Sequence, residues 1–202
     1  MNRKKLTIIL LMICTAIFAV TGCSKKKEKE DASGDYLSGK HHAEIEIADY
    51  GTISVELDAD HAPISVTNFI NLAKEGFYDG LTFHRIIADF MIQGGDPKGD
   101  GTGGSDKTIK GEFTSNGVDN PLSHTRGAIS MARARGMDSA SSQFFIVHQD
   151  STYLDGEYAV FGYVTEGMEI VDAICEDTPV QDENGAVNPE DQPVITSIKV
   201  ID

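Results

Sequence analysis

Short apolar segments that alternate with polar residues, separated by glycine-rich loops, most limit how this 202-residue chain can fold. Residues 43–47 (AEIEI) and 53–57 (ISVEL) alternate strictly, which is typical of strands with one buried face. Asp49-Tyr50-Gly51 lies between them as a turn, so the two segments are predicted to form a hairpin. Further strands are predicted from similar short runs at 81–87, 90–93, 128–131, 143–147, 159–164 and 194–201.

Two other segments have the spacing of a helix. Pro63 opens the first at a position where its missing N–H costs no hydrogen bond, and Gly76 ends it. Apolar residues at 66, 69, 70 and 73 fall on one face between them. A second, shorter helix is predicted over about residues 168–174. Strands and helices do not alternate regularly, which favours a closed or sandwiched antiparallel sheet, with a barrel capped by two helices as the preferred version.

The first 22 residues have the organisation of an export signal. A basic start precedes the apolar run Leu6–Val20, which as a helix spans roughly 22 Å, short of the ~30 Å hydrocarbon core. A signal peptide is therefore favoured over a membrane span. Val20-Thr21-Gly22-Cys23 resembles the lipobox of bacterial lipoproteins, in which cleavage before the cysteine accompanies its lipidation. Residues 1–22 are expected to be a lipoprotein signal peptide and Cys23 the lipidation site; the alternative is an ordinary secretory signal.

Residues 24–39 (SKKKEKEDASGDYLSG) mix charged with small residues and offer almost nothing to bury. With the lipidated Cys23 they are expected to form a disordered tether over residues 23–40. The tether would hold a domain of residues 41–202 at the cell membrane, facing outside the cytoplasm on the extracellular face or in the periplasm. Lys25–Lys27 could also contact anionic lipid, but three acids that follow offset this charge and favour a solvated linker.

The chain carries 17 Lys and Arg against 32 Asp and Glu, a net charge of −15. From His41 onward the balance is −19, which argues against binding to nucleic acid or to an anionic membrane through the bulk field. Three cysteines are too few for a disulfide framework. Cys14 leaves with the signal and Cys23 carries lipid, so Cys175 stays alone and is expected to be a buried helix residue.

Motifs for metal, phosphate or nucleophilic chemistry do not stand out in the sequence. The six histidines lack metal-ligand spacings, so neither a metal nor a cofactor is expected. Residues 96–104 (DPKGDGTGG) lack a G-K-[ST] ending, which favours a tight loop over a phosphate site. Ser139, Ser141 and Ser142 are not in a G-x-S-x-G motif, which argues against a hydrolase.

The arginines of the domain are confined to two places, Arg85 and the segment 126–135. Arg85 lies in the apolar run FHRIIADFMIQGGD. Its guanidinium cannot lose its proton there, so it needs hydrogen-bond acceptors or a ligand. Position alone leaves two interpretations open, a surface or salt-bridge residue and a functional cation.

The segment Phe83–Asp96 resembles the signature of the cyclophilin family of peptidyl-prolyl cis-trans isomerases. The resemblance covers nearly all of residues 41–202 and implies a mainly β fold, an eight-stranded antiparallel closed barrel capped by two helices, in agreement with the periodicity. It also implies isomerisation of X-Pro bonds. Six further blocks follow in family order: GTGG at 101–104, GEF at 111–113, ISMA at 129–132, SQFFI at 142–146, LDG at 154–156 and VFG at 160–162.

The resemblance also implies the residues of the site. It makes Arg85 the catalytic residue. The implied substrate-binding residues are, for the proline pocket, Phe90, Met91, Phe145 and Leu154; for orienting the substrate and Arg85, Gln93 and Gln143; and for the peptide chain, Ala132 and the backbone of Arg133.

Three positions depart from the pattern of the best-known eukaryotic members. Arg133 replaces the usual Asn, but that contact is mainly made by the backbone, so the role can survive. Tyr153 stands where many members have Trp, and Tyr158 where many have His, so both keep an aromatic ring at the edge of the pocket. These changes are expected to weaken cyclosporin binding and to alter peptide preference more than catalysis.

Isomerisation of an X-Pro bond forms no bond to another atom, so it requires no nucleophile, metal or cofactor. The sequence thus predicts a monomeric, lipid-anchored isomerase acting on proline-containing segments of exported unfolded or folding proteins. Two other classes stay open. A surface-tethered chaperone or adhesin would use the same groove only for binding, and a lipid-anchored solute-binding protein should be larger and two-lobed. A proline-isomerisation assay separates the enzyme from the binder.

Overall fold

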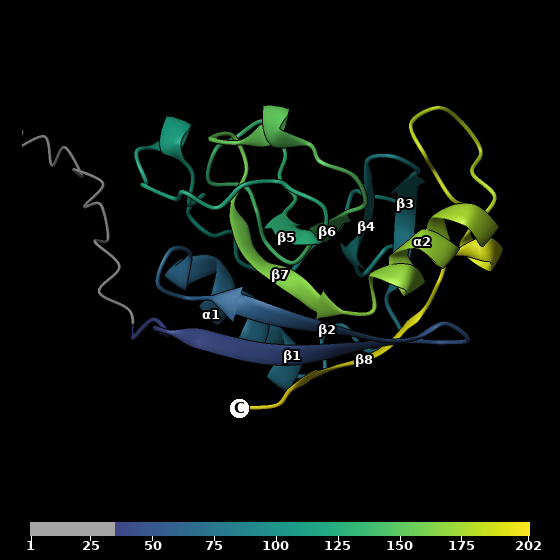
Figure 1. Ribbon diagram of the computed structural model, residues 1–202, viewed down its shortest axis with the longest axis horizontal. Helices are drawn as coiled ribbons and strands as arrows, with labels where there is room; N and C mark the ends of the chain where they lie inside the picture. The colour runs from purple at the N-terminus through teal and green to yellow at the C-terminus, as the bar shows by residue number, and fades with distance from the viewer. Residues whose placement is uncertain (1–34) are drawn as a thin grey trace, which may run out of the picture. The chain divides into compact units, whose positions relative to one another are not determined.

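The computed structural model describes residues 35–202, in which eight strands and two α-helices form (Figure 1). The predicted signal peptide, Cys23 and most of the predicted tether lie outside these residues. Leu37 and Gly39 already contact the domain: their amides donate hydrogen bonds to Thr67 Oγ1 at 2.9 Å and to Asp60 Oδ1 at 2.8 Å. The chain that packs on the domain therefore begins before residue 40.

The first two strands form the predicted hairpin, β1 (Lys40–Ile47) and β2 (Gly51–Asp58). Their register places Ile45 opposite Ile53. Apolar residues alternate with exposed or partly exposed ones on both strands, because successive side chains point to opposite faces of a strand. The tight turn includes Asp49 at φ 66° and Gly51 at φ 117°, backbone conformations that favour Asp, Asn or Gly.

One antiparallel sheet contains all eight strands, in the order β3-β4-β6-β5-β7-β2-β1-β8. Each pairing between neighbours is antiparallel, as the periodicity predicted. The remaining strands are β3 (Thr82–Ile87), β4 (Met91–Asp96), β5 (Ala128–Met131), β6 (Phe144–Val147), β7 (Val160–Glu166) and β8 (Ile195–Val200).

The expected closed barrel is in fact a curled half-barrel, because the two end strands β3 and β8 share no ladder. Among the described residues only the bridge between Thr82 and Val194 and a few hydrogen bonds around it join these two edges. Most of the outer edge of β3 is taken by residues 185–187: the Ile86 amide donates to the Gly185 carbonyl at 2.8 Å. This segment occupies the groups that β8 would need in order to close the barrel.

Helices α1 (Pro63–Lys74) and α2 (Met168–Asp177) cover different parts of the sheet (Figure 1). The residue before α1, Ala62, has no side chain that can cap the helix. The carboxylate of Glu112, 47 residues beyond Ser65, does so instead: it accepts from the Ile64 amide at 2.9 Å, the Ser65 amide at 2.8 Å and Ser65 Oγ at 2.6 Å. Neither helix is long and apolar enough to cross a membrane within residues 35–202.

The two faces of the sheet bury separate apolar clusters. The larger cluster lies under α1, where the Phe69 ring packs against Phe144 with their ring centroids 5.4 Å apart. The smaller cluster contains Met91, Phe145 and Val160. Strand β6 supplies both clusters, because consecutive residues Phe144 and Phe145 point to opposite faces. The smaller cluster forms the floor of the site described below.

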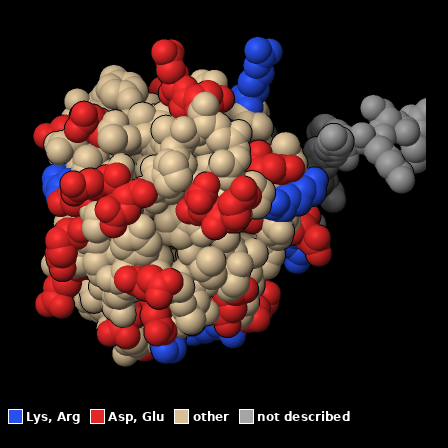
Figure 2. Space-filling view, turned by 90° about the vertical axis from the view of Figure 1, so that its right-hand side faces the viewer, with Lys and Arg blue, Asp and Glu red and all other residues tan. Residues whose placement is uncertain are grey.

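Acidic side chains are spread over the face of the domain seen in Figure 2, which shows the side of Figure 1 that carries α2. Few basic side chains interrupt them. The acidic excess expected from the sequence is thus distributed over this face and is not gathered in one patch.

Candidate active site

Arg85 lies on β3 beside Gln93 of β4, its partner in the strand register. Its Nη1 donates to Gln93 Oε1 at 3.2 Å and its Nε donates to the Asn184 carbonyl at 2.8 Å. Among residues 35–202 no carboxylate forms a salt bridge with it. Burial lowers the pKa of Arg85, but from an ordinary value so high that the group stays charged at neutral pH. The structure therefore favours a functional cation over a salt-bridge residue.

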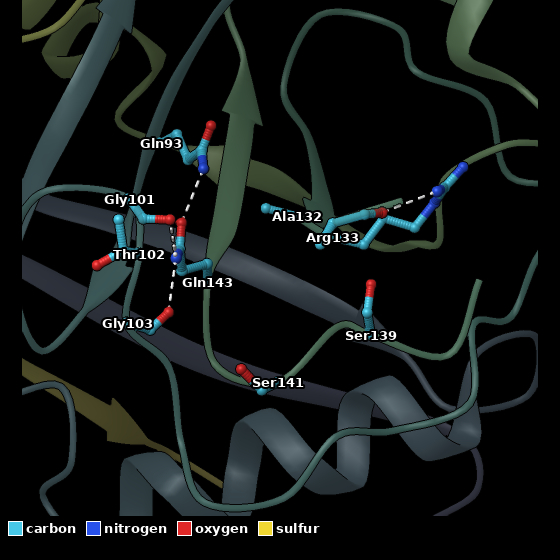
Figure 3. Close-up of a pocket in the computed structure, with 10 residues that line it drawn as sticks. Gln93, Gly101, Thr102, Gly103, Ala132, Arg133, Ser139, Ser141 and Gln143 are labelled. Carbon is cyan, nitrogen blue, oxygen red and sulfur yellow. Dashed lines mark hydrogen bonds between the residues drawn. The ribbon is translucent and has the colours of Figure 1, made fainter. Parts of the chain in front are cut away.

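A chain of amide hydrogen bonds fixes the side chain that orients Arg85. Gln93 Nε2 donates to Gln143 Oε1 at 2.9 Å. Gln143 Nε2 in turn donates to the carbonyls of Gly101 at 3.1 Å and Gly103 at 2.8 Å (Figure 3). The backbone carbonyls can only accept, so both amides have one possible orientation and Gln93 must present its oxygen to Arg85. The structure thus joins the two predicted glutamines in one chain of hydrogen bonds that ends at Arg85.

Arg85 stands at the rim of an apolar hollow of about 230 Å³. The Phe90 ring centroid lies 6.0 Å from its guanidinium carbon. The Phe145 ring forms the floor and packs edge-on against Tyr158 at 6.1 Å. At this volume the hollow can hold a small apolar group, with the cation of Arg85 beside it. Nine of the predicted site residues line the hollow: Arg85, Phe90, Met91, Gln93, Ala132, Arg133, Phe145, Leu154 and Tyr158.

A second hollow of about 270 Å³ adjoins the first, because Gln93, Ala132 and Arg133 line both. Gln143, the tenth predicted residue, lies on its wall opposite Ala132 (Figure 3). An extended peptide lying across Ala132 could place one side chain in each hollow. The second hollow also contains residues that the sequence did not predict: Gly101, Thr102, Gly103, Ala134, Ser139 and Ser141.

Tyr153 is the one predicted site residue that lines neither hollow. Its side chain is 71% exposed, and its ring lies 6.0 Å from that of Phe90, between centroids. It therefore stands outside the rim of the first hollow, next to one of the residues that form it. A small ligand within the hollow would not need to touch it, whereas a larger ligand could.

His124 supports the floor of the first hollow, and the sequence analysis did not include it among the site residues. Its fully buried ring stacks beneath Phe145, with the centroids 5.9 Å apart and the planes 12° from parallel. Nδ1 lies 2.7 Å from Asp155 Oδ1 and Nε2 lies 3.0 Å from Ser130 Oγ. Burial lowers the pKa of His124, opposed by the nearby carboxylate of Asp155. The histidines were compared only with metal-ligand spacings, and nothing local in the sequence marks a ring that supports a pocket floor.

Within residues 35–202 no group of three or more His, Cys, Asp or Glu side chains is placed to hold a metal ion. Cys175, the one free thiol in the described chain, lies on α2 and is partly buried. Burial raises its pKa to about 11, so it stays protonated at neutral pH. The groups that line the first hollow offer a fixed guanidinium at the edge of an apolar surface.

The sequence matches a family model and is similar to several known proteins. The family model described as "Cyclophilin type peptidyl-prolyl cis-trans isomerase/CLD" matches residues 42–200. A peptidyl-prolyl cis-trans isomerase of Helicobacter pylori is 47% identical over 150 residues, which cover 73% of this chain and 85% of that protein. Peptidyl-prolyl cis-trans isomerase B of Bacillus subtilis is 52% identical over 123 residues, covering 61% of this chain and 82% of that one.

Solved structures with the same fold include a cyclophilin type peptidyl-prolyl cis-trans isomerase of Cryptosporidium parvum. It aligns with a TM-score of 0.71 at 29% identity and covers 81% of this chain and 99% of its own. The crystal structure of that protein in the presence of the dipeptide Ala-Pro aligns with a TM-score of 0.70 at 31% identity, covering 80% and 99%.

Proposed function

Since this chain belongs to the cyclophilin-type peptidyl-prolyl cis-trans isomerase family, we propose that Arg85 carries its catalysis and that its substrates are proline-containing segments of exported proteins. An X-Pro bond interconverts over a barrier of about 18–20 kcal/mol, because rotation breaks the amide resonance. The catalyst must favour the twisted amide over both planar isomers. In the twisted state the prolyl nitrogen regains a lone pair, which a fixed hydrogen-bond donor can stabilise.

The hydrogen bonds of Arg85 leave part of its guanidinium free for this task. Nε and Nη1 are held by the Asn184 carbonyl and by Gln93, while Nη2 has no hydrogen-bond partner among residues 35–202. Both strong acceptors are neutral, so they orient the charge without neutralising it. A preorganised donor of this kind needs no rearrangement when the amide twists.

The apolar hollow supplies the second part of the mechanism. Phe90, Met91 and Phe145 can hold the proline ring and exclude water from the guanidinium. Exclusion of water strengthens the interaction between the cation and the nitrogen lone pair. Leu154 and Tyr158 complete the walls. Binding and charge stabilisation therefore come from different residues, and substitution can separate them.

Replacing Arg85 by Ala tests this mechanism. We expect Arg85→Ala to lower kcat/KM by a factor of about 10²–10³ while peptide affinity changes little, because the lost interaction forms mainly in the transition state. Phe145→Ala should weaken peptide binding as well, since it removes the floor of the hollow. Exchange between cis and trans peptide measured by NMR, beside a binding titration, gives both quantities.

Two outcomes of this experiment would contradict the proposal. If Arg85→Ala keeps more than about a tenth of the wild-type rate, the hollow alone accounts for catalysis. If the wild-type protein binds the peptide without accelerating exchange, the site serves a binding protein and not an enzyme.

The place of action is the second part of the proposal. The apolar run Leu6–Val20 followed by Val20-Thr21-Gly22-Cys23 supports export and lipid attachment at Cys23. We propose that the enzyme acts at the outer side of the cell membrane and assists the folding of exported proteins there. The expected monomeric state and the weakened cyclosporin binding stay predictions.

A further inference from the structure

Two of the three positions at which this sequence departs from the family pattern contact each other in the structure. Arg133 stands where Asn is usual and Tyr158 where many members have His. The guanidinium carbon of Arg133 lies 4.7 Å from the centroid of the Tyr158 ring. The two positions are 25 residues apart, so the sequence alone gave no reason to connect them.

The side chain of Arg133 is held firmly in this position. Its Nε donates to the Glu157 carbonyl at 3.0 Å and its Nη1 donates to the Ala134 carbonyl at 3.1 Å. The guanidinium also lies 5.1 Å from the ring centroid of Phe113, and the side chain is only 12% exposed. A guanidinium between two aromatic rings gains both stacking and cation–π attraction.

The ion pair of Arg133 does not explain this arrangement. The carboxylate of Glu157 lies 3.4 Å from Nη2, and that side chain is 53% exposed. Because the carboxylate of Glu157 is exposed, solvent screens this pair, which therefore contributes little to stability. The rings and the two backbone carbonyls therefore determine where the guanidinium lies.

Tyr158 forms a wall of the first hollow, and its ring is packed from more than one side. The Phe145 ring meets it edge-on at 6.1 Å and His124 meets it edge-on at 6.4 Å, between centroids. Arg133 contacts the same ring through its guanidinium. Without that guanidinium the ring would lose one of its packing partners and could turn away from the hollow.

We propose that Arg133 is a positioning residue, which through its side chain holds Tyr158 as a wall of the proline hollow, so that the two residues act as one coupled pair. This inference rests on the proposed isomerase function and adds a side-chain role to a residue expected to act through its backbone. An Asn at position 133 is too short to reach over the ring. A His at position 158 offers a smaller ring, which when protonated would repel the guanidinium.

A double-mutant cycle tests the coupling. The variants are Arg133→Asn, Tyr158→His and the two together, each assayed for kcat, KM and thermal unfolding with one X-Pro peptide. Each single variant is expected to lower kcat/KM by about 3- to 10-fold. The change should appear mainly as a higher KM, because Tyr158 contacts the proline ring equally in the ground state and in the transition state. The kcat/KM of the double variant should be no lower than that of the less active single variant, because either substitution alone already removes the contact.

Three further variants separate positioning from charge and from folding. Arg135→Asn removes the same charge at an exposed residue two positions away and should leave both constants at wild-type values. Arg133→Lys keeps the charge but lacks the planar group that stacks on the ring, so it should resemble Arg133→Asn. Tyr158→Phe keeps the ring, so the effect of Arg133→Asn should persist in that background.

Losses that multiply in the double variant would overturn the inference, as would equal effects of Arg133→Asn and Arg135→Asn. Should Tyr158→His unfold at the assay temperature, the Tyr158→Phe background decides: if Arg133→Asn has no effect there, the coupling through the ring is absent. A wild-type protein without isomerase activity would instead contradict the proposed function, and is distinguishable because it shows no rate to lower.

Discussion

At the scale of single residues, the site depends on side chains whose polar groups have neutral partners. Arg85 is oriented by an amide oxygen and a backbone carbonyl, and Gln93 by the amide of Gln143. Each partner fixes the orientation of the side chain that it contacts and carries no charge that would neutralise Arg85. The positive charge of Arg85 therefore remains available to a substrate, although the domain as a whole is strongly acidic.

Tyr153 is expected to influence ligands larger than a proline residue. Its ring is 71% exposed beside Phe90, outside both hollows. Tyr153→Trp should tighten cyclosporin binding by roughly 5- to 30-fold, since a larger aromatic contact at the edge of the pocket is worth about 1–2 kcal/mol. Peptide turnover should change little. A titration of both proteins with cyclosporin tests this; the same change at Tyr36, far along the chain from the site, is the control. Equal affinities of wild type and Tyr153→Trp would refute the prediction.

His124 and His84 are expected to make stability depend on pH. Burial lowers the pKa of both imidazoles below the ordinary 6.5. As pH falls from 6.5 toward 5, the unfolded chain takes up protons that the folded protein does not, so the free energy of unfolding falls. Each histidine can contribute at most about 1.4 kcal/mol per pH unit. Burial raises the pKa of Glu112, which acts in the opposite direction because the folded protein binds that proton before the unfolded chain does, so the share of the histidines is read from the His→Gln variants.

Urea unfolding at several pH values between 5 and 7.5 measures this slope. His124→Gln and His84→Gln should each flatten it, and the double variant should flatten it most. The prediction is incorrect if the free energy of unfolding of His124→Gln depends on pH as steeply as that of the wild type. Because His124 supports Phe145, peptide affinity should also weaken on acidification in the wild type before the fold is lost.

At the scale of elements, strands that serve two faces build both the core and the site. Strand β4 places Ile92 in the larger cluster and Met91 in the smaller one, and β6 does the same with Phe144 and Phe145. Alternation along these strands thus positions the floor of the hollow directly behind the main core. A shift of one residue in their register would exchange core and site side chains.

Helix α1 depends on a cap that is distant in sequence. Glu112 accepts three hydrogen bonds from Ile64 and Ser65 at the start of the helix. Glu112→Gln should lower the free energy of unfolding by about 1–3 kcal/mol, because the buried donors lose a charged acceptor. The rate per folded molecule should not change. Chemical denaturation measures the effect; Glu176→Gln, an exposed change of the same charge on α2, should have almost none. Equal stability of the two variants would show that Glu112 does not cap α1.

At the scale of the whole molecule, the proposed export and anchoring depend on the N-terminal segment, whereas the described domain includes residues from Leu37 onward. Mature protein is expected to start at Cys23 with a diacylglyceryl group or more, because a single acyl chain binds membranes only marginally. Cys23→Ala should release the domain from the membrane fraction or leave it unprocessed. Cys175→Ala should remain membrane-bound, since that thiol lies in α2. An intact mass showing an unmodified mature N-terminus would exclude the lipoprotein.

The sequence by itself determined those features that depend on neighbouring residues. Alternation with a period of two located β1 and β2, short strand-like runs between glycine-rich loops located the other strands, and Pro63 with its apolar spacing located α1. Arg85 and Gln93 were predicted from the resemblance of the segment Phe83–Asp96 to the family signature, and the structure brings these two residues into register across the hairpin of β3 and β4. Local periodicity and a short hairpin need no knowledge of the rest of the fold.

Only the tertiary structure decided the contacts that complete the site. The carbonyl of Asn184 reaches Arg85 across 99 residues, and Asp155 reaches His124 across 31. Residues 185–187 take the edge of β3, which leaves the barrel incompletely closed, and Arg133 meets Tyr158 on a neighbouring loop. Such contacts follow from the path of the loops through space. No pattern of residues that are near in sequence encodes that path, because the contacting residues become neighbours only when the sheet has curled.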